Sequence, residues 1–125
     1  MHQDISELII YEDPHLIVCR KPAGIPTQTS RIGTRDMVSL LKNHLADPAS
    51  PQKTAGKNGQ HRQPYLAVIH RLDQPVEGLL VFAKTPAAAR ELSRQITSSG
   101  SGKYYLAAVR GIPVPSEADL EDDLV

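Results

Sequence analysis

The sequence predicts an α+β domain, and the order of its apolar segments is the main reason. Short β-branched runs and helical stretches alternate along the chain, but without the regular spacing of a doubly wound parallel sheet. The 125 residues, 40% of them hydrophobic, are enough for one domain with a buried core. No apolar run approaches the roughly 18 residues that a membrane helix needs. We therefore expect a single domain over residues 1–125 and no membrane partner.

Two adjacent strands open the chain. Residues 8–11 and 15–19 are rich in β-branched side chains, and the acidic and proline residues at 12–14 between them are a turn signal. Cys19, the only cysteine, falls within the second strand and is expected to be a small buried residue. A lone cysteine excludes an internal disulfide, which favours a reducing, cytoplasmic setting.

A helix and a loop follow these strands. Two prolines and a glycine at 21–26 end regular structure. Thr34 is the expected N-cap of a helix, because apolar side chains recur at helical spacing over 37–45. Residues 47–64 are rich in proline, glycine and basic residues without periodicity, so we expect a flexible basic loop there.

The second half of the chain predicts three more strands and one more helix. Residues 65–69 and 78–83 have the pattern of buried strands. Thr85 followed by Pro86 is a strong helix start, an N-cap and then proline at the first helical position. Residues 103–109 read as the last strand.

The charge of the chain is zero in total but unevenly distributed. Residues 1–13 carry four acidic residues and residues 111–125 carry five, in both cases without Lys or Arg. All 14 basic residues therefore lie in 14–110 against five acidic ones, a net charge of +9. Such a segment attracts polyanions such as RNA. An ordinary solvated surface that the acidic ends neutralise explains the charge equally well.

Residues 70–73 are the most informative candidate site. Their three ionisable side chains stand where an apolar strand ends and a proline-containing turn begins. Asp73 is a candidate nucleophile or general base, which Arg71 and His70 would keep ionised. On spacing alone, an aspartate that caps the turn in a local ion pair is the more economical interpretation.

A second candidate is the pair Tyr104 and Tyr105 beside Lys103. Adjacent side chains on a strand point to opposite faces, and a tyrosine can stack on an extruded base. One tyrosine in the core and the other over its edge is the alternative. The five histidines lack paired metal-ligand spacing, so no metal site is expected.

Three ordered blocks of the chain resemble the RluA-type pseudouridine synthases. Residues 68–84, centred on Arg71-Leu72-Asp73, strongly resemble the signature of that family. Residues 10–24, with their Lys-Pro-Ala-Gly turn, resemble its opening strand pair, and residues 103–111 resemble its Lys-x-Tyr-x-Ala-x-Val-x-Gly strand. The resemblance implies a pseudouridine synthase-like catalytic fold, with a mixed, mainly antiparallel sheet and flanking helices.

The resemblance also implies roles for individual residues. Asp73 would be the nucleophile that isomerises uridine, attacking either the base or the sugar. Arg71 would help to hold the flipped-out nucleotide, and Tyr105 would stack on the uracil and take part in proton transfer. No metal or organic cofactor is implied, because detachment, rotation and reattachment of the base need only a carboxylate and a shaped pocket.

The implied partner is ribosomal or transfer RNA, which suits the +9 segment. Further substrate contacts are expected from five residues: His70, Lys103, Lys53, Lys57 and Arg62.

Two features depart from the family pattern. Val76-Glu77 stands where the family usually has Thr-Ser, which removes two hydroxyls near Asp73 and adds a carboxylate. The family's catalytic domain also has a later half, with a basic residue that pairs with the aspartate, and no block before Val125 matches it. We therefore expect the N-terminal part of a catalytic domain. The alternatives are a truncated, non-catalytic RNA-binding remnant and a protein-interaction domain without a role in RNA.

Overall fold

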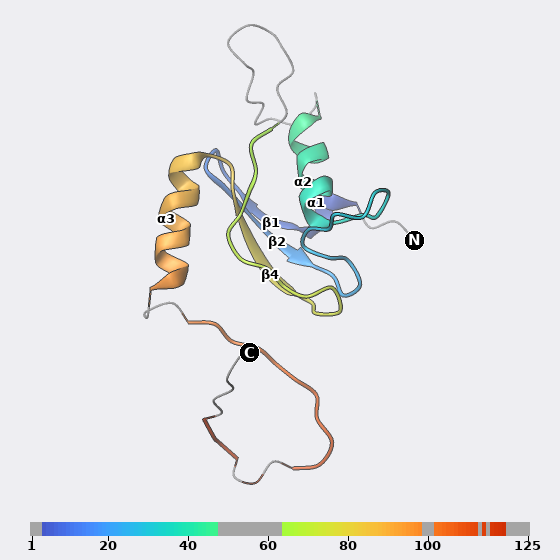
Figure 1. Ribbon diagram of the computed structural model, residues 1–125, viewed down its shortest axis with the longest axis vertical. Coiled ribbons are helices and arrows are strands. Elements are labelled where there is room, and N and C mark those ends of the chain that lie inside the picture. The colour runs from blue at the N-terminus through green and yellow to red at the C-terminus, as the bar shows by residue number, and fades with distance from the viewer. Residues whose placement is uncertain (1–3, 48–63, 99–101, 113, 115, 120–125) are drawn as a thin grey trace, which may run out of the picture.

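The structure is a computed structural model that describes residues 4–47, 64–98, 102–112, 114 and 116–119 (Figure 1). It confirms the predicted α+β class. The regular elements, in chain order, are α1 (Ile5–Leu8), β1 (Ile9–Glu12), β2 (Leu16–Lys21), α2 (Met37–Ala46), β3 (Ala67–Val68), β4 (Gly78–Ala83) and α3 (Pro86–Thr97).

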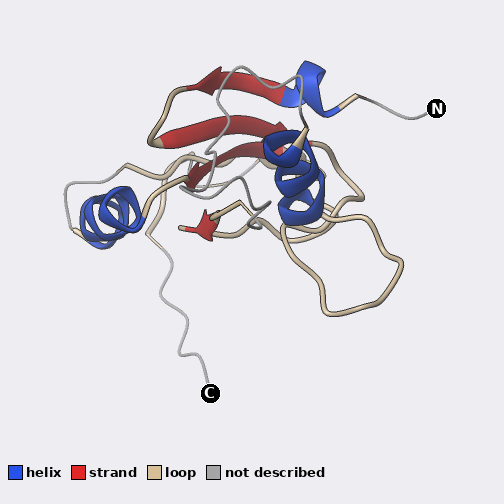
Figure 2. Cartoon of the chain, turned by 90° about the horizontal axis from the view of Figure 1, so that it is seen from above, coloured by secondary structure: helices blue, strands red, loops and turns tan. Residues whose placement is uncertain are grey.

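The described strands form one antiparallel sheet in the order β1-β2-β4-β3 (Figure 2). Strands β2 and β4 form its centre, with Leu16 opposite Ala83 at one end and Lys21 opposite Gly78 at the other. This confirms the expected antiparallel sheet with helices beside it. The pairing also brings the end of β2 next to the start of β4, 57 residues later in the chain.

The core lies between the sheet and α2. Strand β2 alternates, so that Ile17, Cys19 and Lys21 are buried while the residues between them are partly exposed. Leu80 and Phe82 of β4 pack into the same apolar cluster. The predicted burial of Cys19 is confirmed, and this burial raises the pKa of its thiol to about 12.

The N-cap of helix α2 is Asp36 rather than the predicted Thr34. The Asp36 carboxylate is buried and accepts from the Ser39 amide (2.7 Å) and from the Thr29 amide (2.9 Å). A carboxylate can accept both bonds at once. Thr34 instead belongs to a turn, in which its own amide donates to the carbonyl of Arg31. The predicted N-cap was therefore wrong by two residues, because the Asp36 carboxylate accepts more hydrogen bonds here than the Thr34 hydroxyl does.

Two predicted strands also differ. Only Ala67–Val68 of the run 65–69 pairs as β3, because the chain then leaves the sheet. The predicted strand over 103–109 is absent: these residues are exposed, and they pair with no other strand in the described part of the chain. A segment with a β-strand sequence pattern forms a strand only when it can hydrogen-bond to the edge of another strand, and no described segment offers such an edge here.

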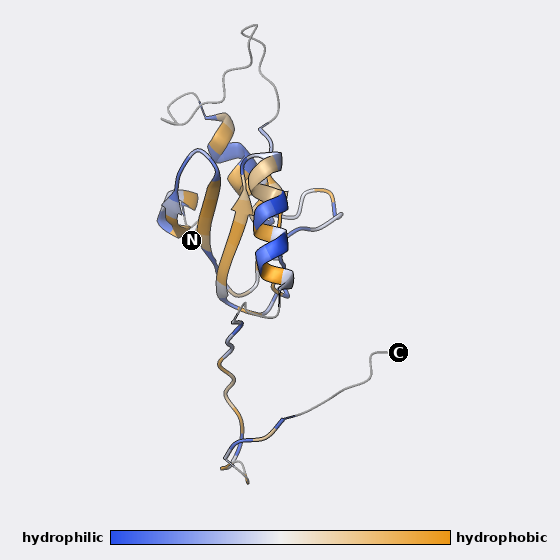
Figure 3. Cartoon of the chain, turned by 90° about the vertical axis from the view of Figure 1, so that its left-hand side faces the viewer, coloured by the Kyte–Doolittle hydropathy of each residue, from blue (hydrophilic) through white to orange (hydrophobic). Residues whose placement is uncertain are grey.

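Helix α3 begins as predicted. The Thr85 side chain accepts from the Ala88 amide at 3.1 Å, and Pro86 occupies the first helical position. Leu92 and Ile96 are partly buried, whereas much of the remaining helix surface is hydrophilic (Figure 3). Within the described residues, no helix is long and apolar enough to cross a membrane.

Candidate active site

The residues Arg71, Leu72 and Asp73 lie in the connection from β3 to β4. Leu72 is buried and packs so closely on Gly78 that a Cβ there would lie 3.0 Å from its Cδ1 atom. Arg71 and Asp73, on either side, are exposed. The apolar residue therefore anchors the segment and presents both polar neighbours to solvent.

The backbone of Leu72 is held by one side chain from a distant part of the sequence. The Leu72 amide donates to Thr27 Oγ1 at 3.1 Å, and the Thr27 hydroxyl donates to the Leu72 carbonyl at 2.9 Å. Thr27 is only 3% exposed. Next to it, Gln28 Oε1 accepts a hydrogen bond from Arg71 Nη2 at 2.9 Å.

A buried lysine joins the turn after β2 to the turn after Asp73. Lys21 Nζ donates to the carbonyls of Pro22 (3.1 Å), Ile25 (2.7 Å) and Gln74 (3.0 Å). Burial lowers the pKa of Lys21, and the negative charges of Asp73 and Glu77 oppose that shift. An ammonium group with three carbonyl acceptors is fully satisfied, so it can remain charged inside the protein.

Gln74 and Gly24 complete this connection. The Gly24 amide donates to the Gln74 carbonyl at 2.8 Å, and Gln74 Nε2 donates back to the Gly24 carbonyl at 3.0 Å. Gly24 has φ +95°, a conformation that favours glycine. The Lys-Pro-Ala-Gly turn and the start of the turn after Asp73 are thus one hydrogen-bonded unit.

The His70 side chain provides the hydrogen-bond acceptor for the Val81 amide of β4 that the backbone of a neighbouring strand would otherwise provide. Its Nε2 accepts from the Val81 amide at 3.1 Å, which requires a neutral ring protonated at Nδ1. Burial, and then the positive charge of Lys103, lower the pKa of His70 and favour this neutral form. Lys103 therefore lies close enough to the site to influence it electrostatically.

Glu77, one of the two departures from the family pattern, pairs with Arg20. The Arg20 Nη1 atom lies 2.9 Å from Glu77 Oε1, and both side chains are substantially exposed. Such a surface ion pair contributes little to stability. Its effect is to balance the carboxylate that Glu77 adds to this turn with a cation.

The structure brings some of the predicted site residues together and leaves others apart. His70, Arg71 and Asp73 share one short segment, but among the described residues no ion pair or hydrogen bond joins His70 or Arg71 to Asp73. His70 binds the Val81 amide and Arg71 binds Gln28, while the charge of Lys103 acts on His70. Tyr105 is 66% exposed, and within the described residues no hydrogen bond joins it to Asp73. The predicted contacts Lys53, Lys57 and Arg62 lie outside the described residues.

Sequence reasoning missed three residues that shape the site: Lys21, Thr27 and Gln28. Only Lys21 carried a usable signal, since it is a charged residue at an inward position of an alternating strand. Within the described part of the chain, no three His, Cys, Asp or Glu side chains are grouped as a metal ion would need.

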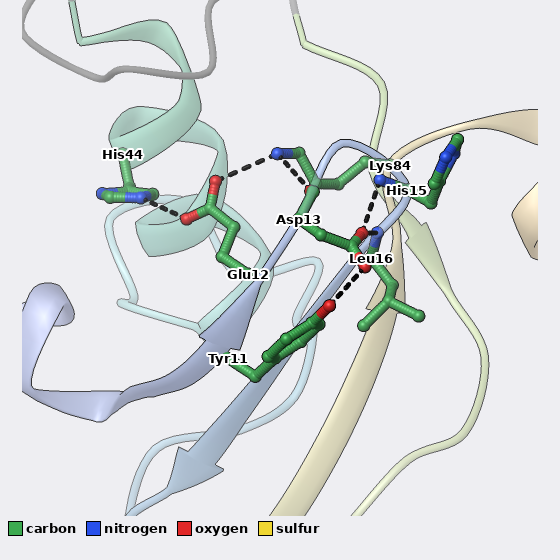
Figure 4. A network of polar contacts seen from close by, with 7 residues as sticks. All are labelled: Tyr11, Glu12, Asp13, His15, Leu16, His44 and Lys84. Carbon is green, nitrogen blue, oxygen red and sulfur yellow. Dashed lines mark hydrogen bonds and ion pairs between the residues drawn. The ribbon is translucent and has the colours of Figure 1, made fainter.

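A second polar network lies at the opposite end of β2 and β4 (Figure 4). Glu12 binds His44 of α2 at 2.8 Å and Lys84 at 3.0 Å. Burial alone would raise the pKa of Glu12, but the hydrogen bonds and charges of Lys84 and His44 lower it overall. This network attaches α2 to the sheet and is remote from Asp73.

Comparison with known proteins decides the family. Residues 15–125 match the family described as RNA pseudouridylate synthase. The chain belongs to that family. The matched range contains the Arg-Leu-Asp segment and all of residues 103–111.

Three curated relatives illustrate the similarity. The chain is 36% identical over 113 residues to the ribosomal large subunit pseudouridine synthase D of Zymomonas mobilis, covering 89% of this chain and 33% of that protein. It is 31% identical over 118 residues to the dual-specificity RNA pseudouridine synthase RluA of Escherichia coli, covering 94% and 47%. It is 34% identical over 103 residues to tRNA pseudouridine synthase C of Pectobacterium carotovorum, covering 82% and 24%.

A solved structure supports the same fold. Human RNA pseudouridylate synthase domain containing 4 matches 74% of this chain and 30% of its own, with a TM-score of 0.51 and 24% sequence identity. The chain spans between about a quarter and about half of the length of the relatives described above.

Proposed function

We propose that this chain carries the nucleophile of an RNA pseudouridine synthase, which isomerises uridine to pseudouridine. The observation behind the proposal is the presentation of Asp73. Its carboxylate is exposed, while the backbone on both sides is fixed by the buried side chains Thr27 and Lys21. A rigidly held but accessible carboxylate suits a nucleophile.

The proposed chemistry needs no oxidant or reductant. Asp73 attacks the base or the sugar and forms a transient covalent bond, and the bond between the uracil nitrogen and the ribose breaks. The base rotates and is attached again through carbon, and the bond to Asp73 breaks, which regenerates the carboxylate. The attacking carbon loses its proton, and the freed nitrogen gains one. Tyr105 is the proposed partner in stacking and proton transfer, which requires residues 102–112 to lie over the site when RNA is bound.

RNA binding is proposed to depend on positive charge near this turn. Arg71 holds the nucleotide that is flipped out of the RNA, and His70 and Lys103 line the same region. Lys53, Lys57 and Arg62 contact the RNA backbone. The names of the relatives indicate ribosomal large-subunit RNA or transfer RNA as the substrate, and the reduced, buried Cys19 suits a cytoplasmic enzyme.

The second candidate is RNA binding without catalysis. Tyr105 has no described hydrogen bond to Asp73, and this favours a chain that retains the basic surface but not the assembled site. The two candidates make different predictions for the Asp73 carboxylate, because only catalysis requires it.

The test uses the 125-residue chain with unmodified transfer RNA and ribosomal large-subunit RNA, and measures both pseudouridine formation and RNA affinity. Asp73→Asn should abolish pseudouridine formation and leave RNA affinity within about twofold, since one exposed carboxylate is replaced by its isostere. Asp119→Asn, at another exposed aspartate, is the control and should keep full activity. Undiminished turnover by Asp73→Asn would contradict the enzyme proposal, and RNA binding without any turnover would favour the second candidate.

A further inference from the structure

The consecutive residues Thr27 and Gln28 contact the Arg-Leu-Asp segment in two different ways. We propose that both are positioning residues: Thr27 fixes the backbone that carries Asp73, and Gln28 holds the Arg71 guanidinium ready until an RNA phosphate takes its place. This inference rests on the proposed function, and it assigns roles to two residues that do not take part in the chemistry.

The bonds of Thr27 fix two consecutive peptide groups. The Leu72 amide belongs to the peptide that follows Arg71, and the Leu72 carbonyl belongs to the peptide that leads into Asp73. One hydroxyl accepts from the first and donates to the second, at 3.1 and 2.9 Å. Thr27 thereby replaces the strand partner that this part of the chain lost after Val68. Because Thr27 is buried, water cannot take over either bond.

Thr27 is itself held by the first turn of α2. The amides of Met37 and Val38 have no partner within the helix at this position, and they donate to the carbonyls of Pro26 (3.0 Å) and Thr27 (3.2 Å). Asp36 binds the Thr29 amide. The positions of Leu72 and Asp73 are therefore set from α2, through the segment 26–29.

Gln28 is suited to be a temporary hydrogen-bond partner of Arg71. Its amide oxygen is neutral, so the bond of 2.9 Å orients the guanidinium without cancelling its charge. Phosphate forms charge-assisted and often bidentate bonds with arginine, which are stronger than a bond to a neutral amide. RNA can thus displace Gln28, whereas a carboxylate at this position would compete with RNA. Both side chains are exposed, so the exchange needs no rearrangement of the core.

The first experiment tests Thr27 with two variants of the 125-residue chain. Thr27→Val keeps the shape but removes both hydrogen bonds, and Thr27→Ser keeps the hydroxyl. We expect hydrogen exchange at the Leu72 amide, followed by NMR, to be at least about tenfold faster in Thr27→Val than in Thr27→Ser. The kcat for pseudouridine formation should fall by about tenfold to a hundredfold in Thr27→Val, with a smaller change in KM. Equal amide exchange and equal kcat in the two variants would overturn the role of Thr27.

The second experiment tests Gln28, whose exposure makes its variants safe for folding. Gln28→Glu should weaken binding of transfer RNA and reduce by about one the slope of log affinity against log salt, because it neutralises Arg71. Ser30→Glu places the same charge on the same exposed loop and is the matched control. In an Arg71→Ala background, the two glutamate variants should be indistinguishable. If Gln28→Glu and Ser30→Glu are already equivalent with Arg71 present, Gln28 has no such role.

The outcomes separate this inference from the proposed function. If the unaltered chain forms no pseudouridine, the proposed function fails. Hydrogen exchange at the Leu72 amide then still decides the role of Thr27, and the RNA affinities of the glutamate variants, with and without Arg71→Ala, still decide the role of Gln28. If the unaltered chain is active and the paired variants behave alike, only the positioning roles fail.

Discussion

Two segments of this molecule contain predicted site residues and differ completely in structure. The turn segment, residues 70–77, and the C-terminal segment, residues 102–112, both combine basic, polar and apolar side chains. The turn segment is bonded to Lys21, Thr27 and Gly24, which lie about 50 residues earlier in the chain. The C-terminal segment exposes five large apolar side chains: Tyr104, Tyr105, Leu106, Val109 and Ile112.

The difference shows what gives a segment its conformation. A run of apolar residues does not hold a strand in place by itself, because its amides and carbonyls need a partner. In the turn segment, side chains of other elements supply those partners. The position of Asp73 is therefore a property of the β2 turn and the loop before α2 as much as of its own neighbours.

The largest expected effect comes from removing the anchor of the turn segment. Leu72→Ala should lower the free energy of unfolding by about 3 kcal/mol, because Leu72 is buried among the core side chains. Leu106→Ala should change it by less than about 0.5 kcal/mol, because Leu106 is fully exposed. Urea denaturation of both variants checks this, and equal losses would show that the C-terminal segment is packed in solution.

Lys21→Met should have the next largest effect. It leaves the Pro22 and Ile25 carbonyls without the ammonium donor, at a cost of about 2 kcal/mol in the free energy of unfolding. The Gln74 carbonyl keeps its bond from Gly24. Lys42→Met on α2 is the matched control and should be nearly neutral. A Lys21→Met protein as stable as the control would contradict the role of Lys21 as a buried donor.

A pair of glycine substitutions sharpens the comparison further. A methyl group at Gly78 would lie 3.0 Å from Leu72 in the packed interior, so Gly78→Ala should cost about 1 to 2 kcal/mol. At Gly102 the methyl group would lie even closer, 2.8 Å, but to the ring of the exposed Tyr104, which can move away. Gly102→Ala should therefore be within about 0.5 kcal/mol of the parent. Thermal unfolding of the two variants gives the answer, and the reverse order would refute it.

The smallest expected effect is a dependence of the turn segment on pH. The folded pKa of His70 is lowered, so its contribution to stability is present above its unfolded pKa of about 6.5 and is lost as the pH falls from there toward the folded value. Protonation at Nε2 removes the acceptor for the Val81 amide. Faster exchange of that amide at pH 5 than at pH 7, after correction for the intrinsic rate, is the expected observation. In His70→Gln, whose side-chain carbonyl does not titrate, the corrected rates should be the same at both values.

Much of the fold could be predicted because local chemistry determined it. Strand Gly78–Ala83 and the start of α3 at Thr85 follow from an apolar run and from an N-cap with proline. The N-cap of α2 was misplaced because Asp36 accepts from the Thr29 amide, seven residues earlier, as well as from the Ser39 amide, and helical spacing does not reveal the first of these bonds. The strand over 103–109 was wrongly expected because a pattern carries no information about its partner.

The candidate site also contains residues that the sequence identifies and residues that it does not. Asp73 and Arg71 were identified from their position at a strand end and from the family resemblance, and their proposed roles remain predictions. Thr27 and Gln28 could not have been found, because they contact residues 45 and 43 positions away in the sequence. Spacing along the chain does not reveal contacts of that separation.

The pairing of β2 with β4 has a consequence for how the site forms during folding. It closes a loop that contains residues 22–77, including Thr27, α2 and Asp73. The contacts that fix the site join residues 45 to 53 positions apart, and such non-local contacts are associated with slow folding. The entropic cost of closure grows only with the logarithm of loop length, about 0.6 kcal/mol for a doubling. The connection between α2 and β3 can therefore change in length at little cost, while the contacts of Thr27 and Lys21 hold Asp73 in place.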